Sequence, residues 1–173
     1  MTGAARPRGI GRATALGLAR GGADVACLDI ARPYEDAPLH GTASGDDLAS
    51  LDAEITALGV QALTVEADVS DEDAVEAAAA RVSEELGTVT LVANVAGGSG
   101  PGFGLGPLLN IPVTEFRRVL DVNVVGVFLG MKHVLPVMLR QNKGSIINTA
   151  SIAGLSAPLI SRPTAPASTP WSG

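Results

Sequence analysis

Short apolar runs alternate along the chain with amphipathic stretches, a pattern that predicts strands alternating with helices. The run ADVACLD over 23–29 ends on an acidic residue and is typical of a parallel strand buried on both faces. Strands are predicted over 23–29, 60–68, 88–97 and 144–151, and helices up to about residue 21 and over 46–58, 70–86 and 114–141. We therefore expect an α/β fold with a doubly wound parallel sheet.

Residues typical of helix ends set the expected boundaries. Ser70, with Asp73 three residues later, indicates a helix start, and Gly87 indicates its end. The long helix is expected to start at Thr114 and to bend at Pro136. The polar loop over 31–45 has no role that the sequence assigns.

Composition and charge exclude several classes of function. The net charge of −6 argues against a nucleic-acid surface, which would be basic. The single cysteine, Cys27, cannot form an internal disulfide and favours a cytoplasmic location. The longest apolar run, 124–131, is far shorter than the roughly 20 residues of a membrane span. The recurring arginines before Asp24 leave an organelle transit peptide as an alternative.

A glycine-rich turn opens the chain, and an acidic residue ends the strand that follows. Gly3, Gly9 and Gly11 precede a helix, where backbone N–H groups can approach a pyrophosphate. Asp29 can accept hydrogen bonds from the adenosine ribose, and it would repel a 2′-phosphate, so it favours NAD over NADP. The alternatives are a flexible glycine-rich terminus and an ordinary loop acid.

The segments TGAARPRGIGRA, ADVSD, ANVAG, NVVG and NTASIAG occur in one order along the chain, with Asp29 after the first of them. Together they resemble the classical branch of the short-chain dehydrogenase/reductase family, over Thr2 to about Pro158. Two departures are visible. The glycine turn has two extra residues, and Val95 replaces the second Asn of the family's Asn-Asn-Ala-Gly motif.

The resemblance implies a role for each matching residue. Ser151 would hydrogen-bond the substrate oxygen, and Asn123 would hold a water of the proton relay. The implied cofactor-binding residues are Gly3, Gly9, Ile10, Gly11, Asp29, Asp68, Val69, Asn94, Ala96 and Gly97. NAD is the implied cofactor, and no metal is implied.

The family's Tyr-x-x-x-Lys, which supplies the proton, has no counterpart where the resemblance places it. Thr164 stands at the tyrosine position, and Tyr34 is the chain's sole tyrosine. A shifted reading frame from Pro163 onward allows codons for Tyr-x-x-x-Lys, so a single-base deletion between the codons of Ser151 and Pro163 is one hypothesis. A natural Pro-rich tail is the alternative.

The resemblance also places a strand before Thr2, where only Met1 stands, so the start of the sequence is expected to be assigned too late. Without that strand its two neighbours would lie about 10 Å apart, with both ladders unsatisfied. The expected organisation is a partial NAD-binding Rossmann domain over 1–160 and a disordered, out-of-frame tail over 161–173.

The expected function is that of an NAD-dependent oxidoreductase that interconverts an alcohol and a ketone. Its partners would be a small-molecule substrate and, in the intact family member, further copies in a dimer or tetramer, with no nucleic acid or membrane. A catalytically inactive nucleotide-binding or interaction fragment is the alternative.

Overall fold

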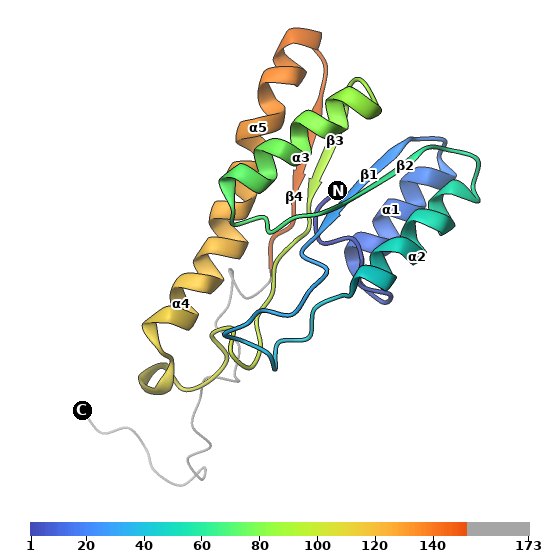
Figure 1. The fold of residues 1–173 in the computed structure, drawn as a ribbon. Helices are drawn as coiled ribbons and strands as arrows, with labels where there is room; N and C mark the ends of the chain where they lie inside the picture. Colours follow the sequence, from blue (N-terminus) through green and yellow to red (C-terminus); the bar gives the residue numbers. More distant parts are fainter. Residues whose placement is uncertain (152–173) are drawn as a thin grey trace, which may run out of the picture.

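The computed structural model describes residues 1–151, and the tail predicted over 161–173 lies outside them. Helices and strands alternate from the glycine turn onward, as the apolar pattern predicts (Figure 1). The elements are α1 (Ile10–Arg20), β1 (Val25–Asp29), α2 (Gly45–Thr56), β2 (Ala62–Glu66), α3 (Glu72–Glu85), β3 (Leu91–Asn94), η1 (Leu108–Asn110), α4 (Val113–Leu120), η2 (Asp121–Val125), α5 (Gly126–Gln141) and β4 (Ser145–Asn148).

The four strands form two parallel pairs. β1 pairs with β2, with Asp29 opposite Glu66, and β3 pairs with β4, with Asn94 opposite Asn148. All four strands therefore end at the same edge of the sheet layer. In open α/β sheets, ligands bind outside this carboxyl edge.

Met1 and Thr2 lie between the two strand pairs and hydrogen-bond to both. The N–H of Leu28 donates to the carbonyl of Met1 at 2.8 Å, and the N–H of Thr2 donates to the carbonyl of Ala93 at 3.0 Å. The expectation that both ladders would be unsatisfied is therefore wrong at this level of the sheet, because two residues suffice to bridge them.

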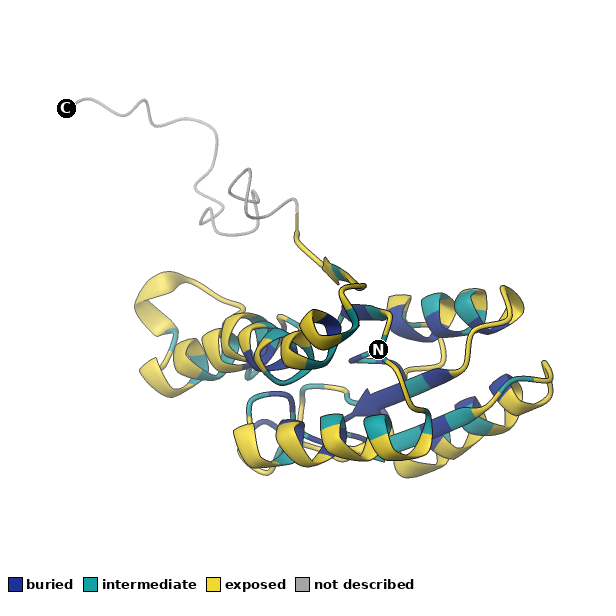
Figure 2. Ribbon diagram, turned by 90° about the horizontal axis from the view of Figure 1, so that it is seen from above, coloured by how far each residue is buried: buried dark blue, intermediate teal, exposed yellow. Residues whose placement is uncertain are grey.

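Helices cover both faces of the strands. α1 and α2 pack on β1 and β2, whereas α5 packs on β3 and on α3 (Figure 1). Buried residues lie in β1, β2 and β3 and on the inner faces of the helices, whereas β4 has no buried residue, as Figure 2 shows. The main cluster consists of small and branched side chains, which suits close helix–strand contact: Ala4, Ala5, Ala15, Ala19, Val25, Cys27, Ala31, Ala43, Leu48, Leu51 and Ile55.

Two of the predicted helix starts are displaced by one residue. Asp71, not Ser70, caps α3, because its carboxylate accepts the N–H of Ala74 at 3.2 Å. The Ser70 hydroxyl is instead engaged by Asp68, to which it donates at 2.6 Å. The long helix begins at Val113, one residue before Thr114, and Pro112 is at its N-cap position.

The long helix runs without a break from α4 through η2 and α5, and η2 is a π-helical turn. By length and hydropathy alone, this 29-residue stretch could cross a membrane, a test that the core helix of a soluble protein also passes. In the described structure α5 buries Gly126, Leu129 and Met138 and exposes Phe128 and Leu139. It is thus a one-sided packing helix.

Candidate functional site

The glycine turn before α1 is so tight that side chains do not fit at two of its positions. A Cβ on Gly11 would lie 2.1 Å from the carbonyl oxygen of Gly3, and one on Gly3 would lie 2.7 Å from the backbone of Ala96. Gly3 also has a φ of +65°, in the left-handed region that favours glycine. Both residues are therefore required by the close approach of three backbone segments.

The two extra residues of the turn protrude into solvent. The N–H of Gly9 donates to the carbonyl of Arg6 at 2.9 Å, which closes a β-turn with the exposed Pro7 and Arg8 at its tip. The longer loop therefore leaves the contact between Gly3 and Gly11 intact.

The N-terminus of α1 has the features of an anion-binding site. Its N-cap is Gly9, no described side chain caps it, and no acidic residue lies in its first turn. The first N–H groups of a helix and its dipole favour a negative group at this position. The chain thus offers a backbone cradle for a phosphate next to Gly3.

Asp29 ties this turn to the end of β1. Its carboxylate accepts the N–H of Ala5 at 2.9 Å and the N–H of Ala31 at 3.2 Å, and the residue is buried. Asp29 therefore lies on the same side of the sheet as the glycine turn. Each carboxylate oxygen has a second lone pair, so a further donor can still be accepted.

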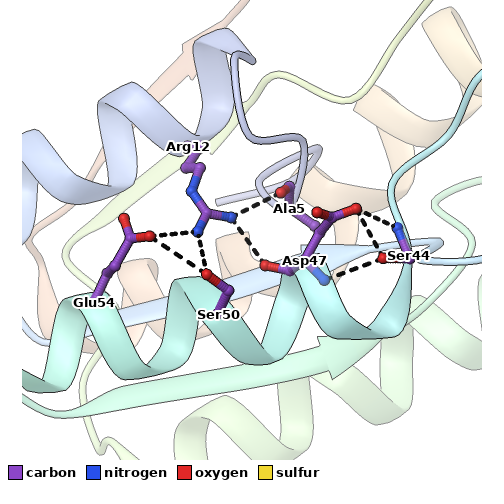
Figure 3. A network of polar contacts seen from close by, with 6 residues as sticks. All are labelled: Ala5, Arg12, Ser44, Asp47, Ser50 and Glu54. Carbon is purple, nitrogen blue, oxygen red and sulfur yellow. Dashed lines mark hydrogen bonds and ion pairs between the residues drawn. The ribbon is translucent and has the colours of Figure 1, made fainter.

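Arg12 fastens the same turn to α2, a role that the sequence does not reveal (Figure 3). The guanidinium is buried and donates to the carbonyls of Ala5 and Asp47, both at 2.9 Å. It also donates to the Ser50 hydroxyl at 3.0 Å and to the Glu54 carboxylate at 2.8 Å. The sequence shows only an arginine near the start of a predicted helix, and such a residue is equally compatible with a charge exposed to solvent.

A cleft at the carboxyl edge brings together five of the predicted cofactor residues. Its volume is about 110 Å³, and its lining includes Gly3, Asp29, Val69, Ala96 and Gly97. Sites for drug-sized ligands typically span roughly 300–1,000 Å³, so the cleft is narrow for a dinucleotide in this conformation. The loop over 31–45 contributes Tyr34 and the segment 40–43 to its lining.

That loop closes the cleft with aromatic side chains. The His40 ring stacks on Phe103 at 4.1 Å between centroids, and Tyr34 packs on Phe103 at 5.4 Å. Arg118 forms an ion pair with Asp36 and donates to the carbonyl of Gly102, which fixes the loop to α4. Tyr34 and His40 therefore form the wall of the cleft that lies on the side of this loop.

Burial shifts the pKa values of two of these side chains. Desolvation, and then the charge of Asp68, raises the pKa of Tyr34 to about 12. Desolvation, followed by the positive charges of Arg6 and Arg118, lowers the pKa of His40. Both rings are therefore held in their neutral forms near neutral pH.

The side-chain amide of Asn123 forms hydrogen bonds with three backbone groups. These bonds explain how a polar side chain is accommodated in a segment of valines. Its amide nitrogen donates to the carbonyls of Gly98 at 3.0 Å and Val119 at 2.9 Å. Its amide oxygen accepts the N–H of Gly98 at 3.1 Å. Asn123 thus joins η2 to the loop after β3, and the relay water remains a prediction.

Asn94 couples the two strands of the second pair. Its amide nitrogen donates to Asn148 at 2.9 Å, while its buried Oδ1 accepts no hydrogen bond from the described residues. A Cβ on Gly130 would lie 2.4 Å from that oxygen, so α5 approaches β3 closely because residue 130 is glycine.

The remaining predicted residues lie around the same edge. Asp68 accepts the N–H and hydroxyl of Ser70, and Ile10 is exposed on the first turn of α1. Ser151 is exposed and follows the end of β4, and it is not among the residues that line the cleft. Position 164 lies outside the described residues.

Parallel strands, helices on both faces and a glycine cradle beside an acidic strand end define the Rossmann-like class of α/β proteins. Comparison with known proteins specifies the family, since the profile described as short chain dehydrogenase matches residues 1–164. The chain therefore belongs to the short-chain dehydrogenase family.

Individual relatives agree with this assignment. The chain is 36% identical to levodione reductase of Leifsonia aquatica over 149 residues, which cover 85% of the chain and 50% of the relative. It is 40% identical to 2-(R)-hydroxypropyl-CoM dehydrogenase of Xanthobacter autotrophicus over 159 residues, or 91% of the chain and 57% of the relative. The chain thus spans about half the length of the curated relatives it matches.

Solved structures show the same fold. Carveol dehydrogenase from Mycobacterium avium in complex with NAD is similar with a TM-score of 0.81 and 30% identity, over 91% of the chain and 55% of that structure. NAD⁺-bound xylitol dehydrogenase is similar with a TM-score of 0.77 and 35% identity, over 91% and 54%.

Proposed function

We propose that this chain provides the cofactor-binding part of an NAD-dependent oxidoreductase that interconverts an alcohol and a ketone. The observation that carries the proposal is the buried Asp29 carboxylate, held beside the glycine turn by the N–H of Ala5. The NAD-bound state of similar structures and the alcohol and ketone names of relatives support it.

The proposed roles follow from the chain's own groups. The N-terminus of α1, opened by Gly9, would hold the pyrophosphate, and Asp29 would accept the hydroxyls of the adenosine ribose. Val69 lines the cleft where the adenine would lie. When bound, the nicotinamide supplies or accepts the hydride.

The catalytic part of the proposal depends on Ser151 and Asn123. Ser151 lies at the carboxyl edge, where its hydroxyl would orient the substrate oxygen, and Asn123 would anchor a relay water beside the loop after β3. Both assignments rest on the family's motif and on this placement.

We further propose that the chain of 173 residues turns over substrate slowly. A tyrosine acting as general acid needs a lowered pKa, whereas burial raises that of Tyr34, the sole tyrosine, to about 12. Loss of a general acid typically slows a reaction by roughly 10²- to 10⁴-fold. Cofactor binding without efficient turnover is the expected behaviour.

The experiment that tests cofactor binding is a titration with NADH and NADPH followed by nicotinamide fluorescence. The native chain should prefer NADH, because Asp29 repels a 2′-phosphate. Asp29→Asn removes the charge and nearly preserves the shape, so it should reduce that preference by about tenfold or more, since 1.4 kcal/mol is a factor of ten. Failure of NADH to bind the folded chain, or an unchanged preference in the variant, would contradict the proposal.

A companion assay with secondary alcohols and NAD tests the slow turnover. Rates near those of ordinary enzymes, roughly 1–10³ s⁻¹, would overturn that part of the proposal.

A further inference from the structure

The loop over 31–45 contributes to the cofactor cleft a side chain that lies outside the motifs of the family resemblance. Tyr34 lines the cleft beside Asp29, together with Ala67 and Val69. These residues lie at or just after the ends of β1 and β2, so the tyrosine is placed at the carboxyl edge of the sheet. A tyrosine in this position can contact a ligand of the cleft directly.

Neighbouring groups hold the Tyr34 ring in place. Its centroid lies 5.4 Å from that of the buried Phe103, and the planes of the two rings are inclined by 50°. The carbonyl of Tyr34 accepts the N–H of Ala37 at 3.3 Å, and Ala37 is itself buried. Tilted contacts between aromatic rings are favourable, and a ring that is already ordered loses little conformational entropy when a ligand binds.

The surface of the cleft around this ring is apolar. Val69, Phe103 and Val122 form a buried cluster, against which Tyr34 and Ala96 pack. All five residues also line the cleft. Such a surface suits the flat face of a ring better than it suits a ribose or a phosphate group.

Two carboxylates disfavour a phosphate group in this part of the cleft. Desolvation, followed by the charges of Asp68 and Asp29, raises the pKa of Tyr34 to about 12, against smaller opposite effects of Arg118 and Arg32. Both carboxylates therefore act on the region of the tyrosine hydroxyl, where they would repel an anionic group. An uncharged part of a nucleotide is thus preferred beside Tyr34.

The size of the cleft points to a single ring system at this position. Its volume is about 110 Å³, whereas sites that enclose a whole drug-sized ligand span roughly 300–1,000 Å³. Asp29, the proposed partner of the adenosine ribose, lines the same cleft. A base attached to that ribose is therefore within reach of Tyr34.

We propose that Tyr34 is a positioning residue for the cofactor and that its ring stacks on the adenine while Asp29 holds the adenosine ribose. The inference rests on the proposed function, because it assigns a further contact of the same site. Every base has a π face, and stacking on an aromatic side chain contributes strongly to nucleotide binding. The loop over 31–45 thereby gains a role in cofactor affinity.

The test is calorimetric titration of the full chain with NADH and with ADP-ribose, which carries the same adenosine but no nicotinamide. Tyr34→Leu keeps an apolar side chain against Phe103 but removes the π face, so both ligands should bind about tenfold more weakly. Tyr34→Phe keeps that face and should bind both within about twofold of the native chain. The matched control is Leu39→Ala, which should leave both affinities unchanged, because Leu39 is exposed on the same loop and does not line the cleft.

A spectroscopic measurement separates stacking from a structural role of the ring, and it leaves Tyr34 itself unchanged. The chain has one tyrosine and one tryptophan, so Trp171→Phe makes Tyr34 the source of its fluorescence. An adenine stacked on the ring quenches tyrosine emission, so ADP-ribose should lower it saturably over the concentrations at which calorimetry detects binding. Ribose 5-phosphate, which carries no base, should leave the emission unchanged.

The outcomes distinguish this inference from the proposed function. Failure of the native chain to bind NADH would overturn both. If NADH binds and Tyr34→Leu leaves its affinity unchanged, the stacking alone is excluded. Tighter binding by this variant would also exclude it, because the ring would then occupy the place of the adenine, and so would unquenched emission at saturating ADP-ribose.

Discussion

At the scale of single residues, Asp29 illustrates how one side chain serves both the fold and the proposed cofactor site. Its two oxygens pair with the N–H groups of Ala5 and Ala31, which belong to the two loops that border the cleft. Asp29→Ala leaves both buried N–H groups unpaired, so we expect the free energy of unfolding to fall by about 2–4 kcal/mol. Urea denaturation measures this change, and Asp29→Asn, which keeps one acceptor, should lose about half as much. An alanine variant as stable as the native chain would contradict the interpretation.

Arg12 is expected to contribute to the free energy of unfolding about as much as Asp29, although the sequence analysis assigned it no role. Removal of its buried guanidinium leaves the carbonyls of Ala5 and Asp47 without those donors, and Glu54 without its ion pair. Arg12→Ala should therefore lower the free energy of unfolding by about 3 kcal/mol. Arg20→Ala, at the exposed end of α1, is the control and should change it by less than about 0.5 kcal/mol. Thermal and urea unfolding of both variants compare the two sites directly.

At the scale of elements, local sequence patterns predicted most of the helices and strands, but few of the contacts between them. Apolar periodicity and Gly87 placed α3 to within two residues, because these signals act within one turn. Ser70 and Asp71 are both good caps, and the choice fell to Asp71 because Asp68 engages the Ser70 hydroxyl. The sequence did not predict the contacts of the loop over 31–45, because its partners Phe103 and Arg118 are far away along the chain, with 82 residues between Asp36 and Arg118.

This loop should also confer a pH dependence on stability. The folded pKa of His40 is lowered, so its neutral ring stabilises the fold above the ordinary value of 6.5, and that contribution is lost as the pH falls from 6.5 through the folded pKa. His40→Phe keeps a ring against Phe103 but cannot titrate. We expect the native chain to lose more unfolding temperature than this variant between pH 7.5 and pH 5. Calorimetry measures both, and equal losses would exclude His40 as the source.

At the scale of the whole molecule, the sequence motifs predicted the family and the class of fold, and the glycine turn and Asp29 lie together as the motif requires. What the motifs could not predict is how two separate strand pairs hold together. That depends on Thr2, whose hydroxyl accepts the N–H groups of Val95 and Ala96, both at 3.1 Å. Such contacts span more than 90 residues, and no local pattern encodes them.

Thr2 is therefore expected to couple the two strand pairs. Thr2→Val keeps the shape of this buried side chain but removes the acceptor, so the N–H groups of Val95 and Ala96 lose their partner. We expect the free energy of unfolding to fall by about 2–3 kcal/mol, with faster hydrogen exchange in β3 and β4 than in β1 and β2. Thr2→Ser retains the hydroxyl and should behave like the native chain. If Thr2 couples the two strand pairs, its loss should let one pair open before the other. An equal increase of hydrogen exchange in all four strands would instead mean that the molecule unfolds as one unit, and it would contradict this role of Thr2.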